Sequence, residues 1–152
     1  MRTALSFDDV LLVPQYSEIE SRKQIEIKQN LRLVGNFSLP IISSPMDTVT
    51  GEAMASAVDS AGGGGIIHRY NEMEDQAKVV VSVTSGGHNV GAAIGVGDDC
   101  IDRALFLSRA GVSFLCIDVA HGHHIKVRSA LKALKEALGD EMHIMAGNVA
   151  TL

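Results

Sequence analysis

The chain contains no tryptophan, only two cysteines and three prolines, and fewer basic than acidic residues. Two cysteines are too few for the disulfide framework of a small secreted domain. A net charge of −5 without a basic stripe would repel a phosphate-rich duplex. No apolar run approaches the roughly 20 residues that cross a bilayer, and acids stand where a signal peptide would be apolar. We therefore expect a cytoplasmic protein without a membrane or nucleic-acid partner.

Five apolar runs are present, and each ends in a short polar or glycine cluster. The runs read IISSPMDT, GGIIHRY, NVGAAIGVG, FLCIDVAHGH and IMAGNVAT, and they end near Ser44, His68, Gly95, Asp118 and Gly147. These residues are 24, 27, 23 and 29 positions apart, and the segments between them have helical periodicity. This rhythm predicts repeated strand–helix units around a parallel sheet. Chemistry in such a sheet collects at the carboxyl ends of the strands.

The same pattern predicts where individual elements begin and end. Strands are expected at about 39–44, 65–68, 90–94, 113–118 and 143–146. The four helices between them include one over about 72–81, followed by a loop at 82–88, and one over about 124–138. Residues 1–36 precede the repeat, and we expect them to be extended, with a hairpin at one end of the sheet.

Capping residues and apolar faces follow from the helical segments. Thr50, Asn71 with Glu74, and Asp98 are the candidate N-caps of the first three helices. The apolar face of the first helix is expected to contain Ala53, Met54, Ala57, Val58 and Ala61. The corresponding face of the fourth helix is expected to contain Val127, Leu131, Leu134 and Leu138.

The sequence indicates neither a glycine-rich nucleotide-binding loop nor a metal site. No GxGxxG sequence follows the first strand, no P-loop occurs, and the GGGG at 62–65 is better interpreted as a helix-to-strand turn. His121, His123 and His124 have neither a partner cysteine nor an HExxH pattern, so we expect no metal site.

Six motifs together resemble the IMP dehydrogenase/GMP reductase family, and most closely its dehydrogenases. They are LSFDDVLLVP, ISSPMDTVT, GGIIHRY, VGAAIGVG, CIDVAHGHH and IMAGNVAT, in this order. The resemblance implies a (β/α)₈ TIM barrel, of which this chain would hold the N-terminal portion. Residues 1–36 would be the pre-barrel segment, and residues 37–152 a partial barrel with about five parallel strands and four helices.

The resemblance also implies an activity. An IMP dehydrogenase converts IMP to XMP and reduces NAD⁺, whereas a GMP reductase converts GMP to IMP with NADPH. Both use a nucleophilic cysteine in a later loop, expected beyond Leu152, so this chain would contain no catalytic residue and would be inactive alone. Cys100 and Cys116 show no sign of activation. The intact enzyme would be a homo-oligomer, most often a tetramer, and can use a monovalent cation. A truncated, non-catalytic nucleotide-binding barrel remains a further alternative.

The family's site residues transfer to the strand ends of this sequence. The resemblance assigns substrate binding to Ser44, Met46 and Asn148, and cofactor binding to Asp118, Ala120, His121 and Gly147. A hydroxyl or amide suits ribose or phosphate oxygens, a thioether packs on a purine face, and a carboxylate accepts ribose hydroxyls. The alternative interpretations are a turn hydroxyl, a core methionine, a helix cap and a polar turn after a strand.

Two features point to different branches of the family. Arg69 stands where the family commonly has lysine, and this lysine is implicated in the ammonia-releasing step of reductases. A permanently charged guanidinium cannot shuttle protons. Together with ISSPMDTVT and DVAHGH, Arg69 favours the dehydrogenase. The regulatory nucleotide-binding modules of most dehydrogenases are not expected here, because only about ten residues separate the second helix from VGAAIG. Reductases always lack these modules.

Overall fold

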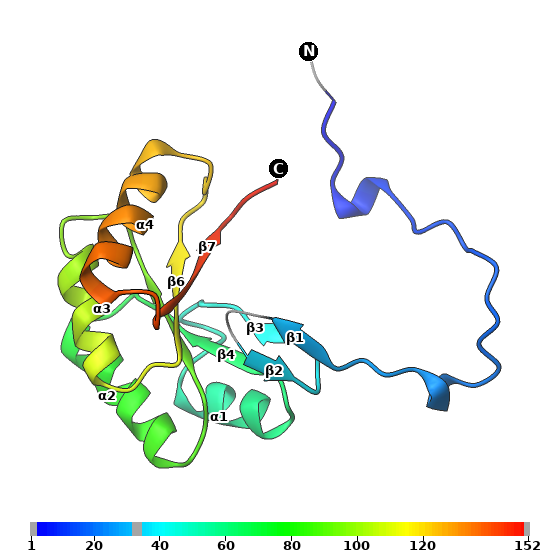
Figure 1. Ribbon diagram of the computed structural model, residues 1–152, viewed down its shortest axis with the longest axis horizontal. Helices are drawn as coiled ribbons and strands as arrows, with labels where there is room; N and C mark the ends of the chain where they lie inside the picture. The colour runs from blue at the N-terminus through cyan, green and yellow to red at the C-terminus, as the bar shows by residue number, and fades with distance from the viewer. Residues whose placement is uncertain (1–2, 32–34, 151–152) are drawn as a thin grey trace.

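A computed structural model describes residues 3–31 and 35–150 and shows five parallel strands in chain order (Figure 1). The strands are β3 (Ile42–Ser43), β4 (Gly64–Ile67), β5 (Gly91–Ile94), β6 (Phe114–Asp118) and β7 (His143–Gly147). The helices that connect them are α1 (Glu52–Ser60), α2 (Met73–Ser85), α3 (Cys100–Arg109) and α4 (Ile125–Leu138). Each strand pairs with the next strand along the chain, so the predicted βα repeat is confirmed.

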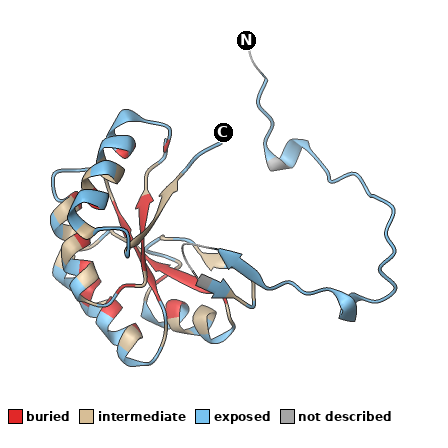
Figure 2. Cartoon of the chain, in the orientation of Figure 1, coloured by how far each residue is buried: buried red, intermediate tan, exposed pale blue. Residues whose placement is uncertain are grey.

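The strands alternate between two apolar layers. Residues such as Ile67, Ile94 and Leu115 belong to a large cluster shared with the helices. The neighbouring positions, including Ile66 and Phe114, form a second cluster on the other face of the sheet. Because both faces of these strands are covered, β4, β5 and β6 are buried along nearly their whole length (Figure 2). This explains why they are continuous apolar runs in the sequence.

The GGGG segment is the predicted helix-to-strand turn. Gly62 has φ of 86°, a conformation that favours glycine, and it ends the turn after α1. A Cβ atom added at Gly65 would lie 2.8 Å from the Cα of Ala55. Glycine therefore allows α1 to lie directly against β4.

The predicted N-terminal hairpin is present. Strand β1 (Gln29–Leu31) pairs with β2 (Gly35–Phe37) in antiparallel orientation. The Phe37 ring reaches the start of β4, where a Cβ atom on Gly64 would lie 2.8 Å from it. The hairpin thus lies near the amino ends of the strands. Before it, residues 3–28 run outward in an extended path interrupted by two short 3₁₀ turns (Figure 1).

Several predicted helix boundaries are wrong. Helix α2 continues to Ser85, so residues 82–85 are helical and not part of a loop. Val83 is buried in the main core, and this packing holds the last turn of the helix in place. The N-cap positions of the first three helices are Gly51, Glu72 and Asp99, none of which caps through its side chain. Each lies one residue after the predicted cap.

The apolar face predicted for α1 is also wrong. Met54, Ala53 and Ala57 are exposed, while Ala55 is fully buried against Gly65. Because α1 approaches β4 closely at Gly65, only a small side chain such as that of Ala55 fits between them. Hydrophobic periodicity does not reveal this preference. The face predicted for α4 is confirmed, since Val127 and Leu134 are buried and Leu131 and Leu138 are half-buried. Within the described residues, no helix is long and apolar enough to cross a membrane.

Candidate functional site

The carboxyl ends of β3, β4, β6 and β7 surround a cavity of about 230 Å³. Four of the predicted site residues line it, namely Ser44, Asp118, Gly147 and Asn148. Asp118 follows Cys116 by two positions, and side chains two apart on a strand share a face. The strand ends therefore bring together polar groups that are up to 104 positions apart in the sequence.

The other three predicted site residues do not line this cavity. Met46 follows β3 and is 50% exposed. Ala120 and His121 follow β6 and are exposed as well. They lie in the loops at the rim, where their side chains remain accessible to a ligand.

The loop after β3 is closed on itself around Ser44. The Ser44 carbonyl accepts a hydrogen bond from the Met46 amide at 2.8 Å and another from the Thr50 hydroxyl. Thr50 is fully buried. It was predicted as an N-cap, but its hydroxyl instead holds this loop. Thr50 therefore stabilises the loop that carries Ser44. This role was not predicted, because the burial of Thr50 cannot be inferred from the sequence pattern.

The loop after β6 is fastened to the end of β7. The Val119 amide donates to the Gly147 carbonyl at 3.1 Å, and the Asn148 amide donates to the Val119 carbonyl at 2.7 Å. The Gly122 amide then donates to the Asn148 carbonyl at 2.7 Å. A Cβ atom at Gly122 would lie 2.7 Å from that same carbonyl oxygen, so glycine is required for the approach. These bonds hold the loop that carries Ala120 and His121 beside Asn148.

Two further residues at this edge were not predicted as site residues. Ser43 lines the cavity, and its buried hydroxyl has no hydrogen-bond partner among the described residues. Arg69 donates from Nη2 to the Asp118 carbonyl at 3.2 Å. It also lines an adjoining cavity of about 350 Å³ together with Arg103 and Lys126. The sequence marked Arg69 only as a departure from the family pattern.

Neither cysteine is activated. Cys116 lines the cavity, but burial raises the pKa of its thiol to about 11. Burial also raises the pKa of Cys100, with a smaller contribution from the nearby Asp99 carboxylate. Because the thiolate is the nucleophilic form, both cysteines are poor nucleophiles near neutral pH.

Three histidines, His121, His123 and His124, lie in the loop after β6 and at the start of α4. The His121 ring lies 6.5 Å from that of His123 and 6.4 Å from that of His124, measured between centroids. His124 is the N-cap of α4, and its Nδ1 accepts a hydrogen bond from the Lys126 amide at 3.1 Å. In residues 3–31 and 35–150, no cluster of three or more histidine, cysteine, aspartate or glutamate residues can hold a metal ion.

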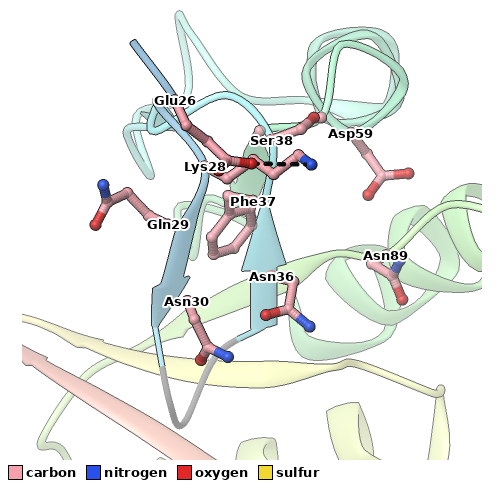
Figure 3. Close-up of a pocket in the computed structure, with 11 residues that line it drawn as sticks. Glu26, Lys28, Gln29, Asn30, Asn36, Phe37, Ser38, Asp59 and Asn89 are labelled. Carbon is pink, nitrogen blue, oxygen red and sulfur yellow. Dashed lines mark ion pairs between the residues drawn. The ribbon is translucent and has the colours of Figure 1, made fainter. Parts of the chain in front are cut away.

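A larger cavity lies elsewhere. It has a volume of about 860 Å³ and is formed by the N-terminal hairpin and the end of α1 (Figure 3). Its lining includes Phe37, Asp59 and Lys28, which pairs with Glu26 at 3.1 Å. Gly62 and Gly63, just before β4, also line it, so it lies at the amino ends of the strands. Ligands of parallel α/β sheets bind at the opposite ends, which makes the smaller cavity the better candidate.

Comparisons with known proteins identify the family of the chain. Residues 4–152 match the family described as the IMP dehydrogenase / GMP reductase domain. The chain is 34% identical to inosine-5'-monophosphate dehydrogenase from Cryptosporidium parvum, over 97% of this chain and 46% of that protein. It is 32% identical to GMP reductase from Streptococcus agalactiae serotype V, over 95% of this chain and 43% of that protein.

A solved structure confirms the architecture. Inosine 5' monophosphate dehydrogenase from Legionella pneumophila superimposes with a TM-score of 0.85 and 40% sequence identity. The match covers 98% of this chain and 45% of that one. The chain thus spans about half the length of the relatives it matches, and its five strands and four helices are the N-terminal part of a TIM barrel.

Proposed function

Because this chain belongs to the IMP dehydrogenase/GMP reductase family, we propose that the complete protein is an IMP dehydrogenase. It would oxidise IMP to XMP and reduce NAD⁺. The observation that carries this proposal is the cavity at the strand ends, which gathers a hydroxyl, a carboxylate and an amide from Ser44, Asp118 and Asn148. These are the groups that the family resemblance assigns to nucleotide and cofactor binding.

The substrate would contact the β3 and β7 side of the site. Ser44 is exposed, and its hydroxyl can bond to a ribose or phosphate oxygen of the nucleotide. The half-exposed Met46 thioether can pack on the purine face. Asn148 can both donate and accept hydrogen bonds, which suits a position between substrate and cofactor.

The cofactor would contact the β6 side. Among the described residues, the Asp118 carboxylate has no hydrogen-bond partner, so it is free to accept the hydroxyls of a nicotinamide ribose. Ala120, His121 and Gly147 would line the same side, since the loop after β6 is fastened to the end of β7. When bound, NAD⁺ would accept the hydride removed from C2 of IMP. The residues therefore fit a nicotinamide cofactor.

This chain would bind and orient the substrate and the cofactor, but it would not provide the nucleophile. Cys116 and Cys100 both have raised thiol pKa values, so the attacking cysteine would come from the later strands of the barrel. The phosphate-binding loops, any monovalent-cation site and the contacts of a homotetramer would depend on the complete protein too.

A GMP reductase that uses NADPH is the second candidate. Helix α2 ends at Ser85 and β5 begins at Gly91, so no regulatory module separates them in this chain. Reductases share this short connection. The dehydrogenase remains favoured because Arg69 is a permanent cation that donates to the Asp118 carbonyl and cannot transfer a proton.

The test is to assay the complete gene product with IMP plus NAD⁺ and with GMP plus NADPH. We expect NADH to form from IMP. The Asp118→Asn variant should raise the KM for NAD⁺ by about tenfold, in line with the loss of charged hydrogen bonds. Asp140→Asn, at an almost fully exposed carboxylate, is the matched control and should leave the KM unchanged.

Each other result points to an alternative. NADPH consumption with GMP would make the protein a reductase. Activity with neither pair would favour a non-catalytic nucleotide-binding barrel.

A further inference from the structure

Arg69 connects two strands that are not neighbours in the sheet. It follows the end of β4 by two residues, and β5 lies between β4 and β6. Its Nη2 nevertheless reaches the carbonyl of Asp118, the last residue of β6, at 3.2 Å. The side chain must therefore pass across the end of β5.

The Asp118 carbonyl requires a donor from outside the ladder. The amide of Val119 donates to Gly147, the last residue of β7, and its carbonyl accepts from Asn148, which follows β7. Successive residues of a parallel strand direct these groups to opposite sides. The Asp118 carbonyl therefore points toward β5. The pairing of β5 with β6 ends at Ile94 and Ile117, so β5 offers no amide at this level. The guanidinium of Arg69 takes the place of that amide.

The residues along the end of β5 leave room for the Arg69 side chain. Gly95 follows β5, and a Cβ atom there would lie 3.4 Å from Nη1 and 3.6 Å from Cζ of Arg69. Glycine therefore leaves room for the side chain to cross. The Tyr70 ring also contacts it, with its centroid 5.3 Å from Cζ. The Tyr70 ring therefore packs against the guanidinium, while glycine at position 95 leaves its path across β5 open.

We propose that Arg69 is a positioning residue that fixes the carboxyl end of β6, and with it the orientation of the Asp118 carboxylate. The proposal rests on the function proposed above, in which that carboxylate binds the cofactor ribose. Arg69 acts through the backbone of Asp118, so its influence on the cofactor should require the Asp118 side chain.

Steady-state kinetics of the complete gene product test this dependence. Arg69→Met should raise the KM for NAD⁺ about fivefold and change the KM for IMP and kcat less than about twofold. The rise is smaller than for a lost hydrogen bond made directly to a charged group, because Arg69 acts through the Asp118 backbone. Arg69→Lys should recover part of the loss, because an ammonium can still donate to the carbonyl. Arg109→Met, which changes an exposed arginine at the end of α3, is the matched control.

A double-mutant cycle separates positioning from direct binding. Asp118→Ala keeps the backbone carbonyl and removes the carboxylate. We expect Arg69→Met to have no further effect on the KM for NAD⁺ in the Asp118→Ala background. Additive effects would overturn the proposal and indicate that Arg69 binds the cofactor independently.

Hydrogen exchange gives a readout that does not depend on activity. Backbone amides of residues 119–122 should exchange faster in Arg69→Met than in the wild type. Their exchange rates should be the same in Arg109→Met as in the wild type. Equal exchange in the wild type and Arg69→Met would refute the proposal. If the wild type turns over neither nucleotide, the proposed function fails, while hydrogen exchange still decides whether Arg69 holds the end of β6.

Discussion

Replacement of Gln76 by methionine tests the polar contacts behind the strand ends. Gln76 lies on α2 and is fully buried. Its Nε2 donates to the Ala93 carbonyl at 2.8 Å and more weakly to the Ile67 carbonyl at 3.4 Å. Its Oε1 accepts from Nη1 of Arg103 at 2.9 Å. One amide thus joins α2 to β4, β5 and α3.

The expected loss follows from these bonds. Methionine has a similar volume, so little cavity is created and the change is mainly the loss of polar contacts. A hydrogen bond from a charged donor contributes about 1.5–3 kcal/mol, and a buried carbonyl left without a partner costs about 1–3 kcal/mol. Arg103 keeps its bonds to Asp99 and Asn71, which limits the damage. We expect Gln76→Met to lower the free energy of unfolding by about 3 kcal/mol.

Equilibrium unfolding in urea, followed by circular dichroism at low protein concentration, measures this loss. The midpoint should fall with an unchanged m-value. Gln15→Met is the matched control, because Gln15 is exposed and its side chain donates to the nearby Val13 carbonyl at the surface. It should change stability by less than about 0.5 kcal/mol. A loss that small for Gln76→Met would show that the buried amide is not needed to join these elements.

Three further predictions address packing, ionisation and assembly. Gly91→Ala should cost about 2 kcal/mol in urea unfolding, because its Cβ would lie 2.4 Å from the Phe114 ring. Gly51→Ala, with no neighbour within 4 Å, should cost less than about 1 kcal/mol, because it only weakens the N-cap of α1. Stability should fall as the pH rises from about 9 to about 11, because the folded chain keeps the Cys116 proton that the unfolded chain releases. Cys116→Ala should weaken this pH dependence. Equal profiles of stability against pH in the wild type and in Cys116→Ala would contradict the prediction. The 152-residue chain alone should show no turnover with IMP and NAD⁺, and it should self-associate through the edge strands β3 and β7. A monodisperse monomer in light scattering would argue against the association.

The sequence alone predicted the architecture because the strands are short and the central three, β4, β5 and β6, are buried on both faces. Each apolar run ends where the chain leaves the sheet, so Ser44, Asp118 and Gly147 identified the ends of β3, β6 and β7 to within one residue. The apolar stripe of α4 was equally clear, since Val127 and Leu134 repeat at helical spacing. These are local patterns, and they depend only on which residues follow one another.

The tertiary structure decided which side chains support those ends. Thr50 is at a position typical of a cap, yet its hydroxyl bonds to Ser44. Gln76 looks like a solvent-exposed helical residue, yet it is fully buried. Arg69 reaches a carbonyl 49 residues away, across the end of β5. Such contacts depend on strand order, register and the space left by Gly95, and none of these is visible in the periodicity of a single segment. The sequence therefore determined the fold and the edge at which we propose that ligands bind, and only the packing of distant segments decided how that edge is held.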